Sequence, residues 1–228
     1  MNFNKINRGE LANMLIENGY VYLEDISDSH NYLEFIKSIG SVFPQYNDSL
    51  IWNVTPDKAI ENSASSVGSY AIDFHSEMYE VDDVPPQYIG LFCVRQAKLG
   101  GSFFLLDVYE ILGLIDVEVL NALKTQELEF STIQSIKDQF KVVKPAYGIT
   151  DSNNVYVRFS TQLFTKLENI HLNSFLRTVK EYSLTNKIEI RQKPNSLLIW
   201  DNYRYFHARS FFEDSNRLLK RICFNINI

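Results

Sequence analysis

Two segments near the start of the chain carry apolar residues at helical spacing. Residues 8–17 place their apolar side chains on one face, and Gly19 is positioned to end that helix. Residues 28–39 repeat the pattern, with Asp28 positioned as the N-cap. The residues directly after Gly19 are apolar and aromatic, which predicts a short strand between the two helices.

Beyond residue 70 the pattern changes to short apolar or alternating segments, which are typical of strands. These predicted strands cover residues 88–94, 102–106, 155–159, 188–191, 196–200, 205–211 and 218–228. Three further helices are expected, two opened by Asp107 and Asp116 and one over residues 167–182. The mixture predicts an α+β, mainly β fold, namely a double-stranded β-helix (jelly-roll) core with flanking helices.

One long segment, residues 47–70, shows neither the helical spacing nor the strand-like alternation of apolar residues. It is rich in Ser and Asn and leads directly into His75. Long irregular segments in compact domains are often functional, so we expect a lid over a site.

Composition narrows the class of protein. The chain has 228 residues and a net charge of −6, with no strongly basic stretch, so a nucleic-acid partner is not expected. No apolar run reaches membrane-spanning length and no signal peptide is evident, so we expect a cytoplasmic protein without a membrane partner. Cys93 and Cys223 lie far apart within apolar runs, which predicts buried free thiols. The sequence assigns no oligomeric state.

Three residues have the chemistry of a metal site. His75 and Glu77 are two positions apart, so in an extended segment both side chains point the same way. With a distant His207 they form the two-histidine, one-carboxylate set that binds non-haem iron and leaves open positions. Taken singly, each has an ordinary alternative, as a surface histidine beside a solvated glutamate or as a structural histidine.

Two arginines follow this set. Arg217 and Arg221 are four residues apart, so in a strand they share a face with Leu219. If that face is the barrel interior, the two cations need anions, and a guanidinium suits a carboxylate. The alternative is an exposed edge strand protected by charge. The apolar Leu219 on the same face argues against full exposure of that face.

Taken together, these motifs resemble the TauD/TfdA-like (taurine dioxygenase and clavaminate synthase) superfamily of Fe(II)- and 2-oxoglutarate-dependent dioxygenases. The resemblance is carried by residues 74–77 (FHSE), 86–93 (PQYIGLFC), 100–102 (GGS), 200–209 (WDNYRYFHAR), 212–214 (FED) and 217–221 (RLLKR). It implies that residues 1–228 form a single oxygenase domain that uses Fe(II), 2-oxoglutarate and O₂ and releases succinate and CO₂.

The resemblance also implies roles for individual residues. His75, Glu77 and His207 are the catalytic iron ligands, and Arg217 pairs with the distal carboxylate of 2-oxoglutarate. Ser102 is the candidate hydroxyl for the same carboxylate, although the family's usual Gly-Gly-x-Thr pattern has Phe103 at its last place here. In the clavaminate synthase and asparagine oxygenase branch the carboxylate ligand is a Glu, as at position 77 here. The presence of this carboxylate argues against halogenation.

For the substrate, the resemblance favours a small, amino-acid-like molecule that is hydroxylated or desaturated at an unactivated C–H bond. The candidate substrate contacts are Arg221, Arg158, Arg209, Asn53, Trp52 and Tyr79. Two alternatives remain open, the same chemistry on a carrier- or peptide-bound substrate and a non-catalytic jelly-roll protein that binds a metal or ligand.

Overall fold

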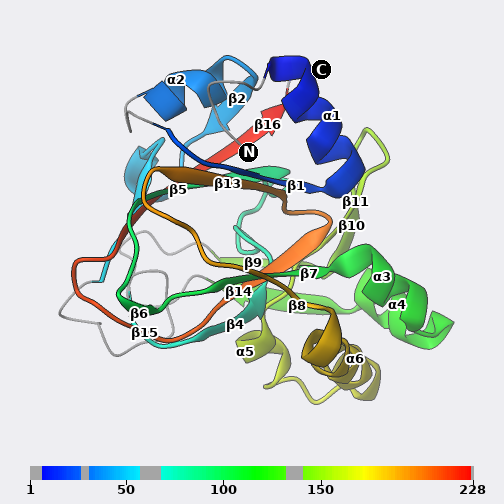
Figure 1. Ribbon diagram of the computed structural model, residues 1–228. Helices are drawn as coiled ribbons and strands as arrows, with labels where there is room; N and C mark the ends of the chain where they lie inside the picture. Colours follow the sequence, from blue (N-terminus) through cyan, green and yellow to red (C-terminus); the bar gives the residue numbers. More distant parts are fainter. Residues whose placement is uncertain (1–6, 27–30, 57–67, 132–140, 227–228) are drawn as a thin grey trace.

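The computed structural model describes residues 7–26, 31–56, 68–131 and 141–226. Two antiparallel sheets face each other, and helices cover their outer sides (Figure 1). The helices are α1 (Arg8–Asn18), α2 (Asn31–Lys37), the 3₁₀ helix η2 (Tyr46–Asp48), α3 (Val108–Leu114), α4 (Val117–Thr125), α5 (Thr161–Phe164) and α6 (Ile170–Asn186).

The larger sheet has the strand order β1-β13-β5-β16-β2, and β3 also pairs with β16. The smaller facing sheet has the order β12-β7-β14-β4. Their strands are β1 (Tyr20–Leu23), β2 (Gly40–Phe43), β3 (Trp52–Val54), β4 (Ile72–His75), β5 (Tyr88–Arg95), β7 (Phe103–Asp107), β12 (Ile188–Ile190), β13 (Ser196–Asp201), β14 (Tyr205–Arg209) and β16 (Leu218–Ile226). This arrangement confirms the predicted jelly-roll core with flanking helices.

Three short pairings complete the strands of the described residues. They are β6 (Leu99–Gly100) with β15 (Phe212–Glu213), β8 (Glu127–Ser131) with β9 (Lys141–Pro145), and β10 (Tyr147–Ile149) with β11 (Val155–Val157).

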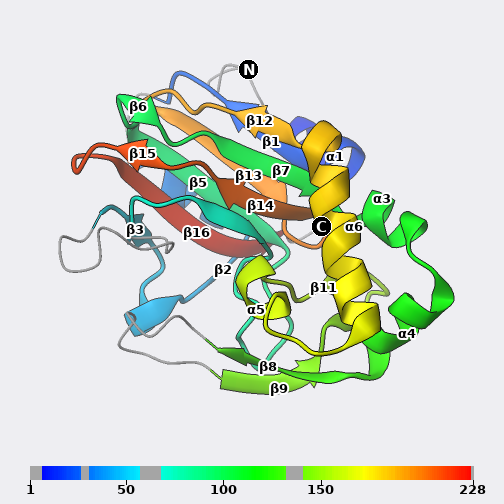
Figure 2. The ribbon, with the colours of Figure 1, turned by 90° about the horizontal axis from the view of Figure 1, so that it is seen from below.

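The core lies in three apolar layers. One layer fills the space between the sheets, a second packs the larger sheet against α1 and α2, and a third packs the smaller sheet against α3 to α6. Figure 2 shows α5 and α6 beside the smaller sheet. Strand β5 is apolar on both sides for this reason, with Leu91 in the layer between the sheets and Phe92 toward the helices.

Local sequence signals fix several helix ends as expected. Gly19 ends α1 in the left-handed conformation with φ of 71°, which glycine adopts without a Cβ clash. The carboxylates of Asp107 and Asp116 accept hydrogen bonds from the first turns of α3 and α4. These capping predictions are confirmed.

Other boundaries differ from the sequence prediction. Helix α2 ends at Lys37 and not at residue 39, and the proposed cap Asp28 lies outside the described residues. The strand predicted over 205–211 ends at Arg209, and a separate short strand, β15, follows. The proposed lid contains η2 at its edge and β3 within it, while residues 57–67 lie outside the described part, so the lid stays a prediction. Within the described residues, no helix has the length and apolar character needed to cross a membrane.

Candidate metal centre

Two neighbouring strands of the smaller sheet bring the histidines together. His75 ends β4 and pairs in register with His207 of β14, with ring centroids 4.0 Å apart. The chain turns after Ser76, and Met78 adopts a φ of 56° in that turn, which brings Glu77 to the histidines. Ligand atoms of His75, Glu77 and His207 all lie within 4.8 Å of one another. The predicted triad is therefore assembled, with its carboxylate on a turn and not on a strand.

Aromatic side chains enclose this cluster. The ring of Phe103 stacks on His207 with centroids 5.3 Å apart, and Trp200 lies 5.1 Å from the same imidazole. Glu77 and His207 are buried. Such a setting excludes water and strengthens electrostatic interactions within the site.

The protonation of the two imidazoles suits a metal. Burial lowers the pKa of His75, and burial, with His75 and Arg221 as close neighbours, lowers the pKa of His207 well below its usual value. Both rings are therefore neutral at pH 7. The Nδ1 atom of His75 lies 2.9 Å from the carbonyl oxygen of Asp73, so Nδ1 carries the proton and Nε2 keeps its lone pair. Two neutral imidazoles and a carboxylate match the facial donor set of non-haem iron.

The polypeptide around Glu77 is held by Asn202. Its Oδ1 accepts a hydrogen bond of 2.7 Å from the Glu77 N–H, and its Nδ2 donates to the carbonyl oxygens of Glu77 and Pro86. This contact explains why an Asn follows β13 in the motif 200–202. Sequence reasoning assigned Asn202 no role of its own.

Arg221 faces the same carboxylate. Its Nη1 lies 2.6 Å from Glu77 Oε1, while the other oxygen, Oε2, lies 3.6 Å from His207 Nε2. Burial disfavours the charged form of Arg221, but the nearby acidic groups, with Glu77 the largest contributor, outweigh it and raise the pKa of Arg221. One oxygen of Glu77 is thus held by the arginine and the other faces the histidine.

Gln45 fixes Arg221 in turn. Its Oε1 accepts a 2.7 Å hydrogen bond from Arg221 Nε, and its Nε2 donates to the Arg221 carbonyl oxygen. Next to it, the Tyr46 hydroxyl donates to the buried carboxylate of Glu80 at 2.6 Å. Gln45 directly precedes η2, Tyr46 is its first residue and Glu80 lies in the turn after Glu77; the sequence pattern gave no signal for Gln45.

Arg217 is buried beside the turn that precedes β7. Its Nε donates to Gln96 Oε1 at 3.1 Å, and its guanidinium lies 4.8 Å from the Phe212 ring centroid. Gly101, with φ of 75°, leaves room for it, since a Cβ there would lie 3.3 Å from Arg217 Nε. Burial lowers the pKa of Arg217 to about 10.

Among the described residues, no ion pair joins Arg217 to a carboxylate. A buried cation without a paired anion is costly, so this position suits an anionic ligand. The predicted burial of both Arg217 and Arg221 is confirmed, and the exposed-edge alternative is excluded. The two arginines nevertheless have different surroundings.

Ser102 and Arg209 lie near Arg217 in space, Ser102 directly after Gly101 and Arg209 over the same Phe212 ring. Ser102 is buried, and its N–H donates to Ser210 Oγ at 3.0 Å. Arg209 also lies 4.8 Å from the Phe212 ring, and its Nη2 donates to the carbonyl oxygens of Gly68 and Tyr70. Burial and the charge of Arg217 lower the pKa of Arg209 to about 9. Arg209 thus joins β14 to the segment before β4.

The remaining substrate candidates fall in two places, Trp52 and Asn53 on β3 and Tyr79 beside Arg158. Asn53 is exposed on β3, and Trp52 packs edge-on against Tyr46, near Arg221. Tyr79 packs against Phe130 on the side of the third apolar layer. Arg158 is buried, and its terminal nitrogens donate to three main-chain carbonyl oxygens. The geometry therefore favours a main-chain role for Arg158 over a substrate contact, because its terminal donors are already used.

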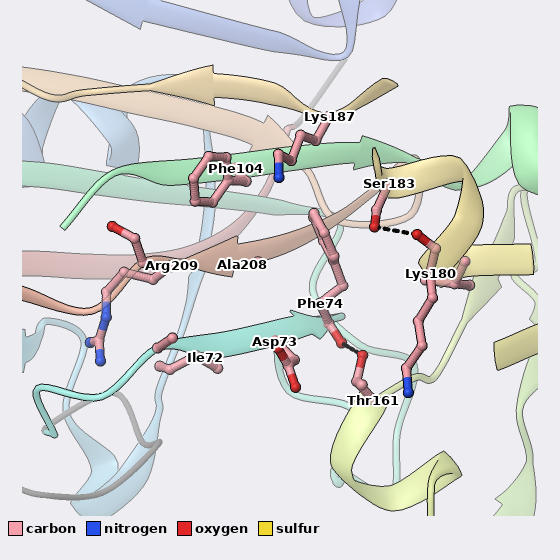
Figure 3. A pocket seen from close by; sticks show the side chains of 13 residues that line it. Ile72, Asp73, Phe74, Phe104, Thr161, Lys180, Ser183, Lys187, Ala208 and Arg209 are labelled. Atoms are coloured by element: carbon pink, nitrogen blue, oxygen red, sulfur yellow. Dashed lines mark hydrogen bonds between the residues drawn. The ribbon is translucent and has the colours of Figure 1, made fainter. Parts of the chain in front are cut away.

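A surface pocket of about 290 Å³ lies on the other side of the smaller sheet. Figure 3 shows side chains from β4, β14 and α6 around it, among them Phe74, Ala208 and Lys180. Phe74 and Ala208 precede and follow the two histidines, so they point away from the metal cluster. The pocket is therefore separate from the candidate metal centre.

The sequence and the fold were compared with known families, curated proteins and solved structures. The model of a family described as taurine catabolism dioxygenase TauD, TfdA family matches residues 1–223. No curated protein matches the chain.

Solved structures share the fold at low sequence identity. Asparagine oxygenase in complex with Fe(II), hydroxyasparagine and succinate aligns with a TM-score of 0.76 and 19% identity, covering 95% of this chain and 78% of that one. The non-haem iron oxygenase OrfP with Fe and alpha-ketoglutaric acid gives 0.72 and 14%, covering 95% and 78%. PvcB from Pseudomonas aeruginosa gives 0.69 and 13%, covering 98% and 81%.

Proposed function

The chain belongs to the taurine catabolism dioxygenase TauD, TfdA family, and from this premise we propose that it hydroxylates or desaturates a small, amino-acid-like substrate. It is an Fe(II)- and 2-oxoglutarate-dependent dioxygenase that uses O₂. We treat residues 1–228 as one oxygenase domain. The proposal concerns the residues of the site and the class of substrate.

His75, Glu77 and His207 would hold the iron. The observation that carries this assignment is their convergence, since two neutral imidazoles and one carboxylate lie within 4.8 Å of one another on the inner side of the smaller sheet. When bound, iron would couple the decarboxylation of 2-oxoglutarate to the oxidation of a substrate C–H bond. The decarboxylation yields succinate and CO₂. The surrounding protein contributes position and exclusion of water.

Arg217 would pair with the distal carboxylate of 2-oxoglutarate. Its burial without a paired carboxylate in the described part of the chain supports this role, because an anion would offset the desolvated charge. Ser102 directly follows Gly101, which packs against Arg217, and Arg209 lies over the same Phe212 ring as Arg217, so both are placed to support the same ligand. We retain Ser102 as the candidate hydroxyl donor.

Arg221 is the best-placed contact for an anionic group of the substrate. It lies directly against Glu77, and its Nη2 is a buried donor without a hydrogen-bond partner among the described residues. A substrate carboxylate would satisfy that donor. Asparagine oxygenase and OrfP have been solved with hydroxylated amino acids, hydroxyasparagine and hydroxyarginine. Both points support an amino acid or close derivative.

Glu77 supports oxygenation over halogenation. Its carboxylate lies within the ligand cluster, so a halide would have to compete with a charged, anchored group for that position. We therefore propose transfer of oxygen or removal of hydrogen, without halide incorporation.

The test is a screen for substrate-stimulated turnover of 2-oxoglutarate. Purified protein is loaded with Fe(II) without oxygen, exposed to air with single amino acids, and assayed for succinate. Wild-type protein is expected to form succinate faster with one or a few amino acids, and His75→Ala is expected to form none. Stimulation only by peptide- or carrier-linked amino acids would redirect the proposal to a bound substrate. No stimulation by either kind would refute the substrate class.

A further inference from the structure

Arg158 occupies an unusual position for a charged residue. It is 1% exposed, and its Nη1 donates to the carbonyl oxygens of Tyr79 at 2.8 Å and Val81 at 2.6 Å. Its Nη2 donates to the carbonyl oxygen of Asp83 at 2.7 Å. The guanidinium of Arg158 thus donates hydrogen bonds to the carbonyl groups of three alternate residues in one segment.

That segment begins at the proposed iron ligand Glu77. Residues 77–83 form turns and bends, without strand or helix, and Met78 has a φ of 56°. A segment without ladder hydrogen bonds must satisfy its buried carbonyl groups in another way. Arg158 supplies three such donors from outside the segment.

The residues after Arg158 bind the other half of the ligand motif. The Phe159 N–H donates to Ser76 Oγ at 3.0 Å, and the Ser76 N–H donates to the Phe159 carbonyl oxygen at 3.0 Å. The Thr161 hydroxyl donates to the Phe74 carbonyl oxygen at 2.9 Å. Residues 158–161 therefore contact the chain on both sides of His75 and Glu77.

We propose that Arg158 is a positioning residue that holds the turn after Glu77 and thereby sets the geometry of the metal site. This inference rests on the proposed function, because it takes His75, Glu77 and His207 as the metal ligands. Residues that orient metal ligands without touching the metal commonly change metal affinity 10- to 100-fold when they are altered.

The side-chain chemistry fits this role better than simple packing. Burial lowers the pKa of Arg158, so the fold retains a cation where an apolar side chain would be easier to bury. The rigid guanidinium fork can span three carbonyl groups, whereas a lysine ammonium presents its donors from one atom. Arg158→Lys should therefore keep the positive charge and lose some of the hydrogen bonds to the three carbonyl groups.

The experiment measures binding of Co(II) to the purified protein in the absence of substrate. Co(II) stands in for iron, and its absorption bands report the ligand set directly. Trp200, 5.1 Å from His207, gives a second signal through fluorescence quenching. We expect Arg158→Ala to weaken Co(II) binding about 10- to 100-fold and to alter the absorption bands, with Arg158→Lys in between.

Chemical rescue separates positioning from general damage. Free guanidinium at about 10 mM, far below denaturing concentrations, is expected to restore much of the Co(II) affinity of Arg158→Ala, while NaCl at the same concentration is not. If Arg158→Ala does not fold, the same titration is made with Arg158→Lys.

Arg191 offers a matched control. It too donates to three main-chain carbonyl oxygens, those of Ala97, Lys98 and Gly100, but on a turn that carries no proposed metal ligand. Arg191→Ala is expected to keep wild-type Co(II) affinity. Equal weakening in both variants, or unchanged affinity in Arg158→Ala and Arg158→Lys, would overturn the inference. Failure of the wild-type protein to bind Co(II) would instead refute the proposed metal site itself.

Discussion

Replacing Arg217 by methionine tests the 2-oxoglutarate site most directly. Methionine keeps most of the apolar stem against Phe212 and removes the guanidinium. A hydrogen bond to a charged group contributes about 1.5–3 kcal/mol, and leaving the partner carboxylate unpaired adds to the loss. We therefore expect binding of 2-oxoglutarate to weaken by about 2–3 kcal/mol, or roughly a hundredfold in the concentration required.

The same change should have little effect on the protein without ligand. Arg217 is 2% exposed and forms no ion pair with a carboxylate in the described residues. Removing its guanidinium therefore relieves an uncompensated buried charge. It also removes the hydrogen bond to Gln96 and the contact of the guanidinium with Phe212. These effects oppose each other. The melting temperature of the ligand-free variant should thus stay within a few degrees of wild type.

Ligand-induced stabilisation gives the second measurement. With 2-oxoglutarate at about 100 times its wild-type Kd, the wild-type protein gains about 2.7 kcal/mol, whereas a hundredfold weaker variant gains about 0.4 kcal/mol. Thermal unfolding with Co(II), with and without 2-oxoglutarate, measures this difference, and succinate formation against 2-oxoglutarate concentration measures the requirement. The exposed Arg95, whose Nε donates to the Asn216 carbonyl oxygen, is the control, and Arg95→Met should change neither.

An unchanged 2-oxoglutarate requirement in Arg217→Met would refute the assignment and move the role to Arg209 or Arg221. A large fall in ligand-free stability with normal binding would show that the buried charge serves the fold.

Three further predictions follow from the same geometry. Glu77→Ala leaves the buried Arg221 without its ion-pair partner, so urea unfolding should show a loss of about 3–5 kcal/mol, and the double variant with Arg221→Met should recover most of it. Wild-type enzyme turning over in chloride should give no chlorinated product by mass spectrometry, and finding one would contradict the role given to Glu77. Burial raises the pKa of Cys93 and Cys223 to about 12, so the thiolate fraction at pH 8 is very small. Both thiols should react with a disulfide reagent only after unfolding, and fast reaction of the native protein would contradict their burial.

The features that sequence reasoning predicted well are those with a local chemical signal. Asp107 at the start of α3 and Gly19 at the end of α1 act through their own backbone neighbourhoods, so their identity alone predicts the boundary. The spacing of His75 and Glu77 indicated a shared ligand site, although a turn, and not an extended segment, brings Glu77 to the histidines. Strands β8 and β9 were missed, although the alternation of Leu128 and Phe130 in β8 offered a readable signal.

The parts of the site that were missed act through the main chain or through distant partners. Gln45 lies at the start of an irregular turn, and its importance depends on contact with Arg221 at the other end of the sequence. Asn202 and Arg158 form hydrogen bonds with main-chain groups of other segments. Every residue has such groups, so the residue types of those segments do not indicate the contact. Arg158 as a substrate contact stays a prediction, although its hydrogen bonds to three carbonyl oxygens favour a main-chain role.

The strand order has a consequence for synthesis of the protein. Among the residues that the structure describes, strand β4, which ends at His75, pairs within its sheet with β14 alone, and β5 lies between β13 and β16. Since chains are made from the N-terminus, β4 and β5 leave the ribosome long before the strands that flank them exist. The two halves of the metal site therefore meet only when the last part of the chain has emerged. Until then the early ligands have no fixed geometry, so a truncated chain should lack the folded metal site.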